Sequence, residues 1–239
     1  KIESPDQLYR NTPAGGLNVS AMALDVDFGY GFCAAAGDVN GDGFPDLYVG
    51  NGGRNRLLIN NGDGTFDDAT EEAGLTSEEW TATTLIADLN GDGLVEVIVA
   101  GSILHGENGG TLSEGEAGQG FFAAYDSIGS IPIVADLDND GMQEVIAGNT
   151  VYDAAGNVVC QSDTDDGYAA AADLDMDGEG EWALVGNGSL WVIDGNCDVL
   201  LQQGLPGTGT GGPPTVGDFD GDGLPDLVVG MRQPRSSTG

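Results

Sequence analysis

Nine residues, Asp38 to Asp46, carry acidic or amide side chains at relative positions 1, 3, 5 and 9, with a glycine at position 6. Oxygens two residues apart point to the same side of a curling chain, and the glycine allows a sharp turn where a Cβ would clash. Calcium takes six to eight oxygen ligands in a flexible geometry. The stretch therefore predicts a loop that wraps around a divalent cation.

The same pattern occurs four more times, at residues 88–96, 136–144, 173–181 and 218–226. In each loop we expect side-chain ligands at positions 1, 3, 5 and 9, and the backbone carbonyl of position 7 as one more ligand. Five loops predict about five calcium ions. The predicted ligands are Asp38, Asn40, Asp42, Phe44 and Asp46; Asp88, Asn90, Asp92, Leu94 and Glu96; Asp136, Asp138, Asp140, Met142 and Glu144; Asp173, Asp175, Asp177, Glu179 and Glu181; and Asp218, Asp220, Asp222, Leu224 and Asp226.

The spacing distinguishes these loops from other metal sites. An EF-hand places a bidentate glutamate at position 12 between two helices, whereas here the last acid is at position 9 and a β-rich run follows it. Magnesium disfavours a site with so many protein ligands. Zinc prefers histidine and cysteine ligands, and the chain has only one histidine and three cysteines. A single Asp-Gly stretch is also compatible with an ordinary turn, but five in phase favour calcium.

Short strands surround each loop in a repeated order. In the first unit we expect strands at residues 32–37, 47–50, 56–60 and 65–69, with a hairpin turn at 61–64. The loops begin 50, 48, 37 and 45 residues apart. A period in this range with four strands per unit predicts the blades of a β-propeller.

Two parts of the chain depart from the repeat. The second unit has a glycine- and glutamate-rich excursion at residues 102–120, and we expect residues 121–125 to close that blade. The fifth unit has only its first two strands, while residues 6–11 and 18–28 read as two unassigned strands. Joining the two ends completes a blade and removes exposed strand edges. We therefore expect one all-β domain over residues 1–239, a five-bladed propeller whose N-terminal strands complete the C-terminal blade; an open array completed by a neighbouring chain is the alternative.

The first unit resembles a known repeat. Residues 27–32, 36–43 and 46–50 resemble the FG-GAP repeat of integrin α-subunit propellers, and residues 55–66 look like the related VCBS repeat of bacterial secreted proteins. The resemblance extends over about 200 residues, from Phe28 to Gly230. It implies a β-propeller with calcium between the first two strands of each blade. The family usually closes with seven blades, whereas five motifs occur here.

The net charge of −34 limits the partners that we expect. Nucleic acid and anionic membrane surfaces require a basic face, and the chain has only six lysines and arginines. No apolar run of about 18 residues is present, so we expect no membrane insertion. Carboxylates at the four ligand positions account for 18 of the 40 acidic residues, which indicates that much of the acidity serves the loops.

Three cysteines allow one disulfide and one thiol. We expect a Cys160–Cys197 bridge, since both lie in the later repeats, and a buried thiol at Cys33; the sequence alone does not give connectivity. A high density of calcium loops indicates an extracellular, cell-surface or periplasmic protein.

Three functions fit these observations. The first is a calcium-stabilised binding or adhesion module that recognises a protein or glycan. The second is a self-assembling structural subunit of a surface or extracellular polymer, and the third is a secreted polysaccharide-active enzyme. His105 is the only histidine and has no base and nucleophile pattern around it, so we predict no catalytic residues and no enzyme activity.

Overall fold

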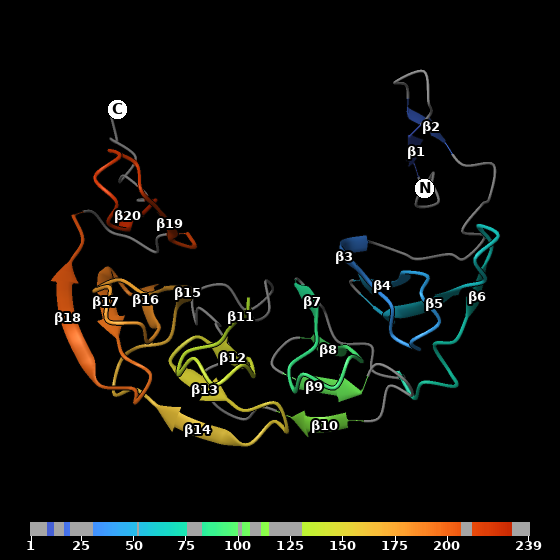
Figure 1. The fold of residues 1–239 in the computed structure, drawn as a ribbon, viewed down its shortest axis with the longest axis horizontal. Helices are drawn as coiled ribbons and strands as arrows, with labels where there is room; N and C mark the ends of the chain where they lie inside the picture. The colour runs from blue at the N-terminus through green and yellow to red at the C-terminus, as the bar shows by residue number, and fades with distance from the viewer. Residues whose placement is uncertain are drawn as a thin grey trace, which may run out of the picture.

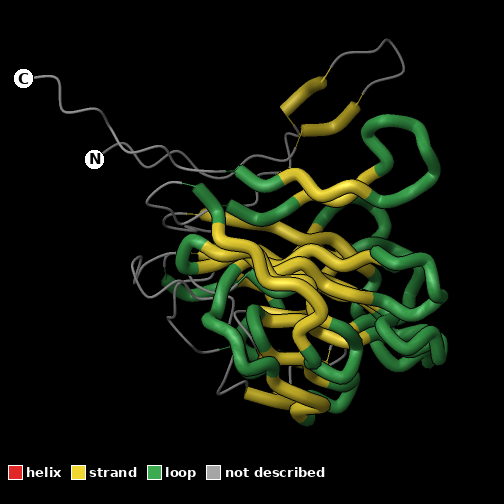
Figure 2. The backbone as a smooth tube through the Cα atoms, turned by 90° about the vertical axis from the view of Figure 1, so that its left-hand side faces the viewer, coloured by secondary structure: helices red, strands yellow, loops and turns green. Residues whose placement is uncertain are grey.

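The computed structural model describes residues 9–11, 17–19, 31–51, 53–75, 83–99, 102–105, 111–114, 131–206 and 212–230. These residues form strands, turns and loops, and no α-helix occurs among them (Figure 2). Within these ranges there is accordingly no helix of the length and apolar character that a membrane crossing needs. The predicted all-β class is confirmed.

Four sheets share one design, with four antiparallel strands that follow chain order from one edge to the other. The first contains β3 (Gly31–Gly37), β4 (Asp46–Asn51), β5 (Arg56–Asn60) and β6 (Phe66–Asp68), and the second contains β7 (Thr84–Ala87), β8 (Glu96–Val99), β9 (Ser102–His105) and β10 (Thr111–Glu114). The third contains β11 (Ile133–Ala135), β12 (Glu144–Ala147), β13 (Thr150–Tyr152) and β14 (Val158–Gln161), and the fourth contains β15 (Tyr168–Ala172), β16 (Glu181–Gly186), β17 (Ser189–Ile193) and β18 (Val199–Gly204).

Two further sheets have two strands each. β1 (Tyr9–Asn11) pairs with β2 (Leu17–Val19), and β19 (Thr215–Gly217) pairs with β20 (Asp226–Val228). Figure 1 shows the four larger sheets following one another around an arc, with the two small sheets at its open side. The strands β3, β7, β11 and β15 lie nearest the centre of the arc (Figure 1). This arrangement is propeller-like, but in the described residues β1–β2 and β19–β20 are separate sheets, so the predicted joining of the two ends is not seen.

Burial follows the position of a strand within its sheet. All six residues of β16 are buried, because this strand lies between β15 and β17 in its sheet and packs against the third sheet. All six residues of β18, at the outer edge of the same sheet, are exposed. The apolar character of Val199, Leu200 and Leu201 gives them high strand propensity, but their place at the rim leaves them in contact with solvent.

The hydrophobic core is divided into layers between adjacent sheets. Trp182 is fully buried and packs with Ile146 and Trp191, joining the third and fourth sheets. Smaller clusters join the other pairs: Tyr48 packs with Val97 between the first and second sheets, and Ile98 packs with Val145 between the second and third. Each blade is therefore held by its neighbours as well as by its own hydrogen bonds.

The predicted disulfide is confirmed. Cys160 in β14 is bonded to Cys197, which lies in the turn before β18, so the bridge joins the outer parts of the third and fourth blades. The Cys33 side chain in β3 is half-buried rather than buried as predicted. Its sulfur lies 3.3 Å from the Thr84 hydroxyl of β7, at the junction of the first two blades.

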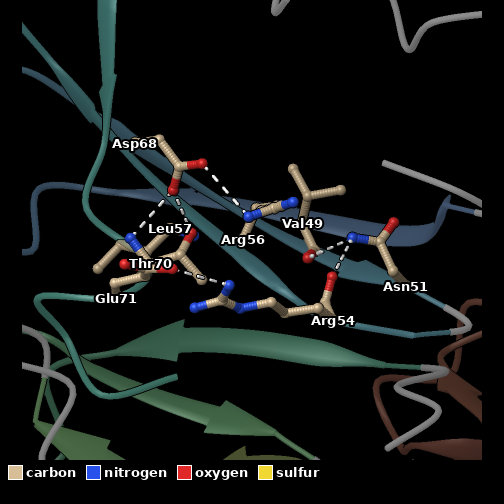
Figure 3. A network of polar contacts seen from close by, with 8 residues as sticks. All are labelled: Val49, Asn51, Arg54, Arg56, Leu57, Asp68, Thr70 and Glu71. Atoms are coloured by element: carbon tan, nitrogen blue, oxygen red, sulfur yellow. Dashed lines mark hydrogen bonds and ion pairs between the residues drawn. The ribbon is translucent and has the colours of Figure 1, made fainter. Parts of the chain in front are cut away.

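A polar network closes the outer part of the first blade (Figure 3). The buried hydroxyl of Thr70 accepts a hydrogen bond from the Leu57 amide (3.1 Å) and contacts the Asp68 carboxylate. Arg56 is paired with the same Asp68 carboxylate at 3.4 Å, and Arg54 with Glu71 at 3.2 Å. Two of the six basic residues of the chain thus bind acids within this blade.

The second blade corrects one prediction. The first part of the excursion at residues 102–120 is regular, because it forms the two outer strands of the blade, β9 and β10. Ile103 and Leu104 are buried against the neighbouring strands, and this pair of apolar residues was too short to be recognised as a strand among glycines and glutamates. The strand predicted at residues 121–125 and most of the one predicted at 18–28 lie outside the described residues.

Candidate metal centres

All five predicted loops lie in the same place, between the first and second strands of a sheet. The structure describes every predicted ligand in them. Each second strand begins at position 9 of its loop, and its pairing with the first strand brings the two ends of the loop together, as in the pair Gly37 and Asp46. The β-hairpin therefore fixes the loop at both ends.

Within the first loop, the side chains at loop positions 1, 3 and 5 turn inward. The Asp38 carboxylate accepts hydrogen bonds from the amides of Asp42 (3.1 Å) and Gly43 (2.7 Å). The Asn40 side-chain oxygen accepts from the Asp42 amide at 2.9 Å, and the Asp42 carboxylate accepts from the Phe44 amide at 2.9 Å. Local bonds of this kind are typical of Asp and Asn in turns, and here they curl the chain around its own oxygens.

The other four loops repeat these contacts. In each of them the acid at position 5 accepts a hydrogen bond from the amide of position 7, and the acid at position 1 accepts from the amide of position 6. The position 6 glycine has φ between 88° and 97° in all five loops, a conformation that strongly favours glycine. In these four loops the amide nitrogen of position 6 lies 3.0 Å from the carboxylate oxygen of position 1; the position 6 residues are Gly93, Gly141, Gly178 and Gly223.

The acid at position 9 ties the end of each loop to its beginning. Its carboxylate accepts a hydrogen bond from the amide of position 2, at 2.6 Å in the pair Glu181 and Leu174 and at 2.8–3.0 Å in the other loops. Asp46, Glu96 and Glu181 are almost completely buried in this position. Sequence patterns did not predict the amide donors at position 2.

Burial raises the pKa of the carboxyl groups of Asp46, Glu96, Glu144 and Glu181. The backbone donor at position 2 opposes this shift, while the negative charges of the other loop acids raise the pKa further. The ionised position 9 carboxylate is therefore costly in the metal-free loop. A bound cation would remove that cost, because an opposite charge nearby favours the ionised form.

The donor set fits calcium. In the last three loops, carboxylate oxygens of positions 1, 3 and 9 lie within 4.8 Å of one another, in the groups Asp136, Asp138 and Glu144; Asp173, Asp175 and Glu181; and Asp218, Asp220 and Asp226. In the first two loops position 3 is Asn40 or Asn90, whose amide oxygen is the corresponding donor. A carboxylate oxygen that accepts a backbone hydrogen bond still has a lone pair for a cation. The carbonyl ligands of position 7 and the ions themselves stay predictions.

Neighbouring loops are also joined to each other. The Gln143 amide of the third loop donates to the Leu89 carbonyl of the second at 2.9 Å, and the Gly180 amide of the fourth donates to the Leu137 carbonyl of the third at 2.7 Å. An open hollow of about 400 Å³ lies between the third and fourth loops, where Asp136 and Asp173 both line it. The metal loops thus form a connected series along these blades.

One contact in the first loop was not predicted. The Asn60 amide of β5 donates to the second oxygen of Asp46 at 2.7 Å, and its side-chain nitrogen donates to the Pro45 carbonyl at 3.0 Å. Asn60 lies 14 residues from Asp46 in the sequence, and only the pairing of β4 with β5 brings the two together. No local pattern identifies such a residue.

Comparison with known proteins agrees with this geometry. The family model described as FG-GAP-like repeat matches residues 38–99, and the one described as FG-GAP repeat matches residues 214–232. No curated protein matches the chain significantly. Among solved structures, the biofilm matrix protein Bap1 of V. cholerae is similar, with a TM-score of 0.56 and 20% identity over 86% of this chain and 32% of Bap1.

Two less similar structures are rhamnogalacturonan lyase YesW and an Agrocybe aegerita lectin specific for non-reducing terminal N-acetylglucosamine. YesW has a TM-score of 0.48 and 16% identity over 95% of this chain and 59% of its own. The lectin has a TM-score of 0.47 and 19% identity over 85% of this chain and 63% of its own. The chain thus spans about a third of Bap1 and about three fifths of the other two.

Fold and loops together define a propeller-like all-β protein built from repeated sheets, each with an acidic loop after its first strand. The two family matches identify FG-GAP repeats at residues 38–99 and 214–232 of the chain.

Proposed function

We propose that this protein is a calcium-stabilised extracellular binding or adhesion module that recognises a protein or glycan ligand. The observation that carries the proposal is the carboxylate at position 9, which is buried in Asp46, Glu96 and Glu181. In the last three loops it lies close to the carboxylates of positions 1 and 3. A carboxyl group that is costly to ionise without a cation occurs at position 9 of the first four loops, which indicates that the fold is adapted to bound calcium. The metal is structural in this proposal and does not take part in a reaction.

An extracellular, cell-surface or periplasmic location is supported by two features of the chain. The Cys160–Cys197 disulfide is of a kind that persists in oxidising compartments. The calcium loops require the high calcium concentrations found outside cells. Bap1, which shares the fold, is a biofilm matrix protein, and a matrix setting agrees with both features.

The proposed architecture is a ring of five blades, closed when the N-terminal strands complete the blade that begins with β19 and β20. The four complete sheets and the two half sheets support this count. Closure protects the edge of β20, which in an open arc is available to other chains. Completion by a second copy would instead give a self-assembling subunit.

Binding without turnover is the activity that we propose. The only histidine, His105, lies exposed at the end of β9, where it is paired with Glu96 of the second metal loop. Among the described residues, the groups of three acids that the structure brings together belong to the metal loops. The negative charge excludes nucleic acid and anionic membrane surfaces as expected partners.

A combined binding and turnover experiment tests the proposal. The protein is applied to glycan and extracellular-protein arrays in 1–2 mM calcium (roughly extracellular levels) and again in EDTA. We expect retention on one ligand class only with calcium, and recovery of that ligand unchanged in mass. Cleavage of a bound polysaccharide would overturn the binding-module proposal in favour of an enzyme, and equal binding in EDTA would overturn the role of calcium.

A further inference from the structure

The small N-terminal sheet has the same register as the outer half of the first blade. β1 and β2 pair Tyr9 with Val19, Arg10 with Asn18 and Asn11 with Leu17. β5 and β6 pair Leu58 with Asp68, Ile59 with Asp67 and Asn60 with Phe66. Adding 49 to both members of each N-terminal pair gives the corresponding pair in the first blade.

This match is specific to the first blade. The outer strand pairs of the second, third and fourth blades each contain a register shift, whereas neither β1–β2 nor β5–β6 has one. The β1–β2 sheet is thus equivalent to a third and fourth strand of a blade of the first type. It has no first and second strand beside it among the described residues.

The C-terminal half sheet is of the first type as well. Only the first and fifth loops end in Pro-Asp, as Pro45-Asp46 and Pro225-Asp226, while the other three end in glutamate. Asp46 and Asp226 make the same contact with position 2, each accepting a backbone amide at 3.0 Å through one oxygen. The β19–β20 sheet is therefore equivalent to the first and second strands of such a blade.

The two half blades complement each other at one residue. In the first blade, the backbone amide of Asn60 donates a hydrogen bond to the Asp46 carboxylate, and the side-chain nitrogen of Asn60 donates one to the Pro45 carbonyl. The residue of β1 in the place of Asn60 is Asn11, and the structure assigns no donor to the second oxygen of Asp226 within the described residues. In the third and fourth blades, the residues in register with position 8 are Ala154 and Gly195, neither of which has an amide side chain.

We propose that β1–β2 is the outer half of the blade whose inner half is β19–β20, with Tyr9 opposite Leu227. The Asn11 backbone amide then bonds to Asp226, and its side chain bonds to the Pro225 carbonyl. Asn11 is then a positioning residue of the fifth calcium loop. The inference rests on the proposed calcium-stabilised ring, and it adds the register in which β1 pairs with β20 and the role of Asn11. The hairpin comes from the same chain, because one outer half and one inner half are present and both lie at the open side of the arc (Figure 1).

Disulfide trapping tests the register. Tyr9→Cys and Leu227→Cys are combined in a Cys33→Ser background and oxidised mildly in calcium. We expect a disulfide between positions 9 and 227 within one chain in most molecules, identified by peptide mass and by a monomer on non-reducing gels. The control combines Tyr9→Cys with Val229→Cys, two residues out of register, and should crosslink several-fold less. Dimers joined through positions 9 and 227, or equal crosslinking in the control, would overturn the proposal.

Hydrogen exchange on the unmodified protein provides a test that does not depend on the double variant folding. We expect the amides of β1 and β2 to be protected in calcium to the same degree as those of β5 and β6, and to exchange faster in EDTA. An isolated two-stranded hairpin has little stability in water, so an undocked β1–β2 would exchange rapidly in both conditions and would overturn the inference.

Calcium titration tests the role of Asn11. Asn11→Ala keeps the backbone amide but removes the side-chain bond to the Pro225 carbonyl, so it should weaken one calcium site about fivefold, the effect expected on losing a hydrogen bond between neutral groups. Asn60→Ala is the positive control, because the bond from its side chain to the Pro45 carbonyl is present in the structure, and Asn61→Ala in the exposed neighbouring turn is the neutral control. If Asn11→Ala titrates like Asn61→Ala while calcium still raises the melting temperature, the inference fails and the proposed function stands.

Discussion

The amide of Gly180 donates a hydrogen bond of 2.7 Å to the carbonyl of Leu137. Gly180 is at position 8 of the fourth loop and Leu137 is at position 2 of the third. The same Leu137 donates its own amide to Glu144 at position 9 of the third loop, and its side chain is buried in the core between the blades. One residue thus links a metal loop, the next metal loop and the hydrophobic core.

Gly180→Ala tests this contact between loops. An added Cβ would lie 3.2 Å from the Leu137 Cα and 3.1 Å from its Cδ2, closer than backbone atoms can easily allow. We expect a loss of about 1 to 2 kcal/mol in the free energy of unfolding in calcium, as for other overpacked sites. Urea unfolding measures it, with Gly204→Ala in β18 as control, where nothing lies within 4 Å of the new Cβ. Equal stability of the two variants would show that the loops are not closely packed.

Removal of calcium should destabilise the whole protein. At roughly 1 mM free calcium and a Kd of about 10⁻⁴ M, each site contributes about 1.4 kcal/mol, so five sites contribute about 7 kcal/mol. That amount is comparable to the net stability of many domains. Thermal unfolding followed by circular dichroism should show a large fall in Tm in EDTA and recovery on adding calcium but not magnesium. A Tm that is the same in EDTA would contradict calcium stabilisation.

The repeated parts of the fold were predictable because each depends on a short local pattern. β5 at Arg56–Asn60 has the predicted bounds, since its apolar residues are enclosed by turn signals. The loops were predictable for the same reason, because Asp, Asn and Gly at fixed spacing act within nine residues.

Contacts between distant segments were not predictable. The bond from Asn60 to Asp46 and the bond from Gly180 to Leu137 depend on how strands pair and how blades pack. Apolar character also failed to predict burial at the rim, where Val158 is 55% exposed and Leu200 is 53% exposed. A sequence gives the propensity of such a strand, but its position at the edge of the sheet decides its exposure.

The disulfide between the third and fourth blades should contribute strongly to stability. Cys160 and Cys197 are 37 residues apart, and closing a loop of that length in the unfolded chain is worth about 4 kcal/mol in the chain-entropy description. The Cys160→Ser, Cys197→Ser double variant should therefore unfold at a much lower urea concentration. Cys33→Ser is the control for loss of a thiol. A double variant as stable as this control would show that blade packing alone holds the junction.

Met176, at position 4 of the fourth loop, has a backbone conformation that is unfavourable for its type. Its φ is 64°, whereas three of the other loops have glycine at this position. Its side chain is exposed, so packing does not compensate for the strain. We expect Met176→Gly to increase the free energy of unfolding by about 1 kcal/mol. Asn139→Gly in the third loop should increase the free energy of unfolding by less, because asparagine tolerates positive φ. A loss of stability in Met176→Gly would contradict backbone strain at this position.

Glu181→Gln should have opposite effects with and without calcium. Burial raises the pKa of the Glu181 carboxyl, so its ionised form destabilises the metal-free fold. A raised pKa means that the favourable contribution of this group is present at low pH and is lost as the pH rises through its folded pKa. At pH 7 in EDTA, replacing the carboxylate by an amide should therefore leave the Tm unchanged or increase it.

In calcium the same substitution should lower the Tm, because a charged ligand is lost and the affinity of the fourth loop falls by about tenfold or more. Glu179→Gln is the matched control, since it removes one charge from the same loop at an exposed side chain that is not a predicted ligand. Isothermal titration calorimetry should show one weakened site in Glu181→Gln and none in Glu179→Gln. If both variants lower the Tm equally in calcium, the effect is one of net charge, and position 9 is not a ligand.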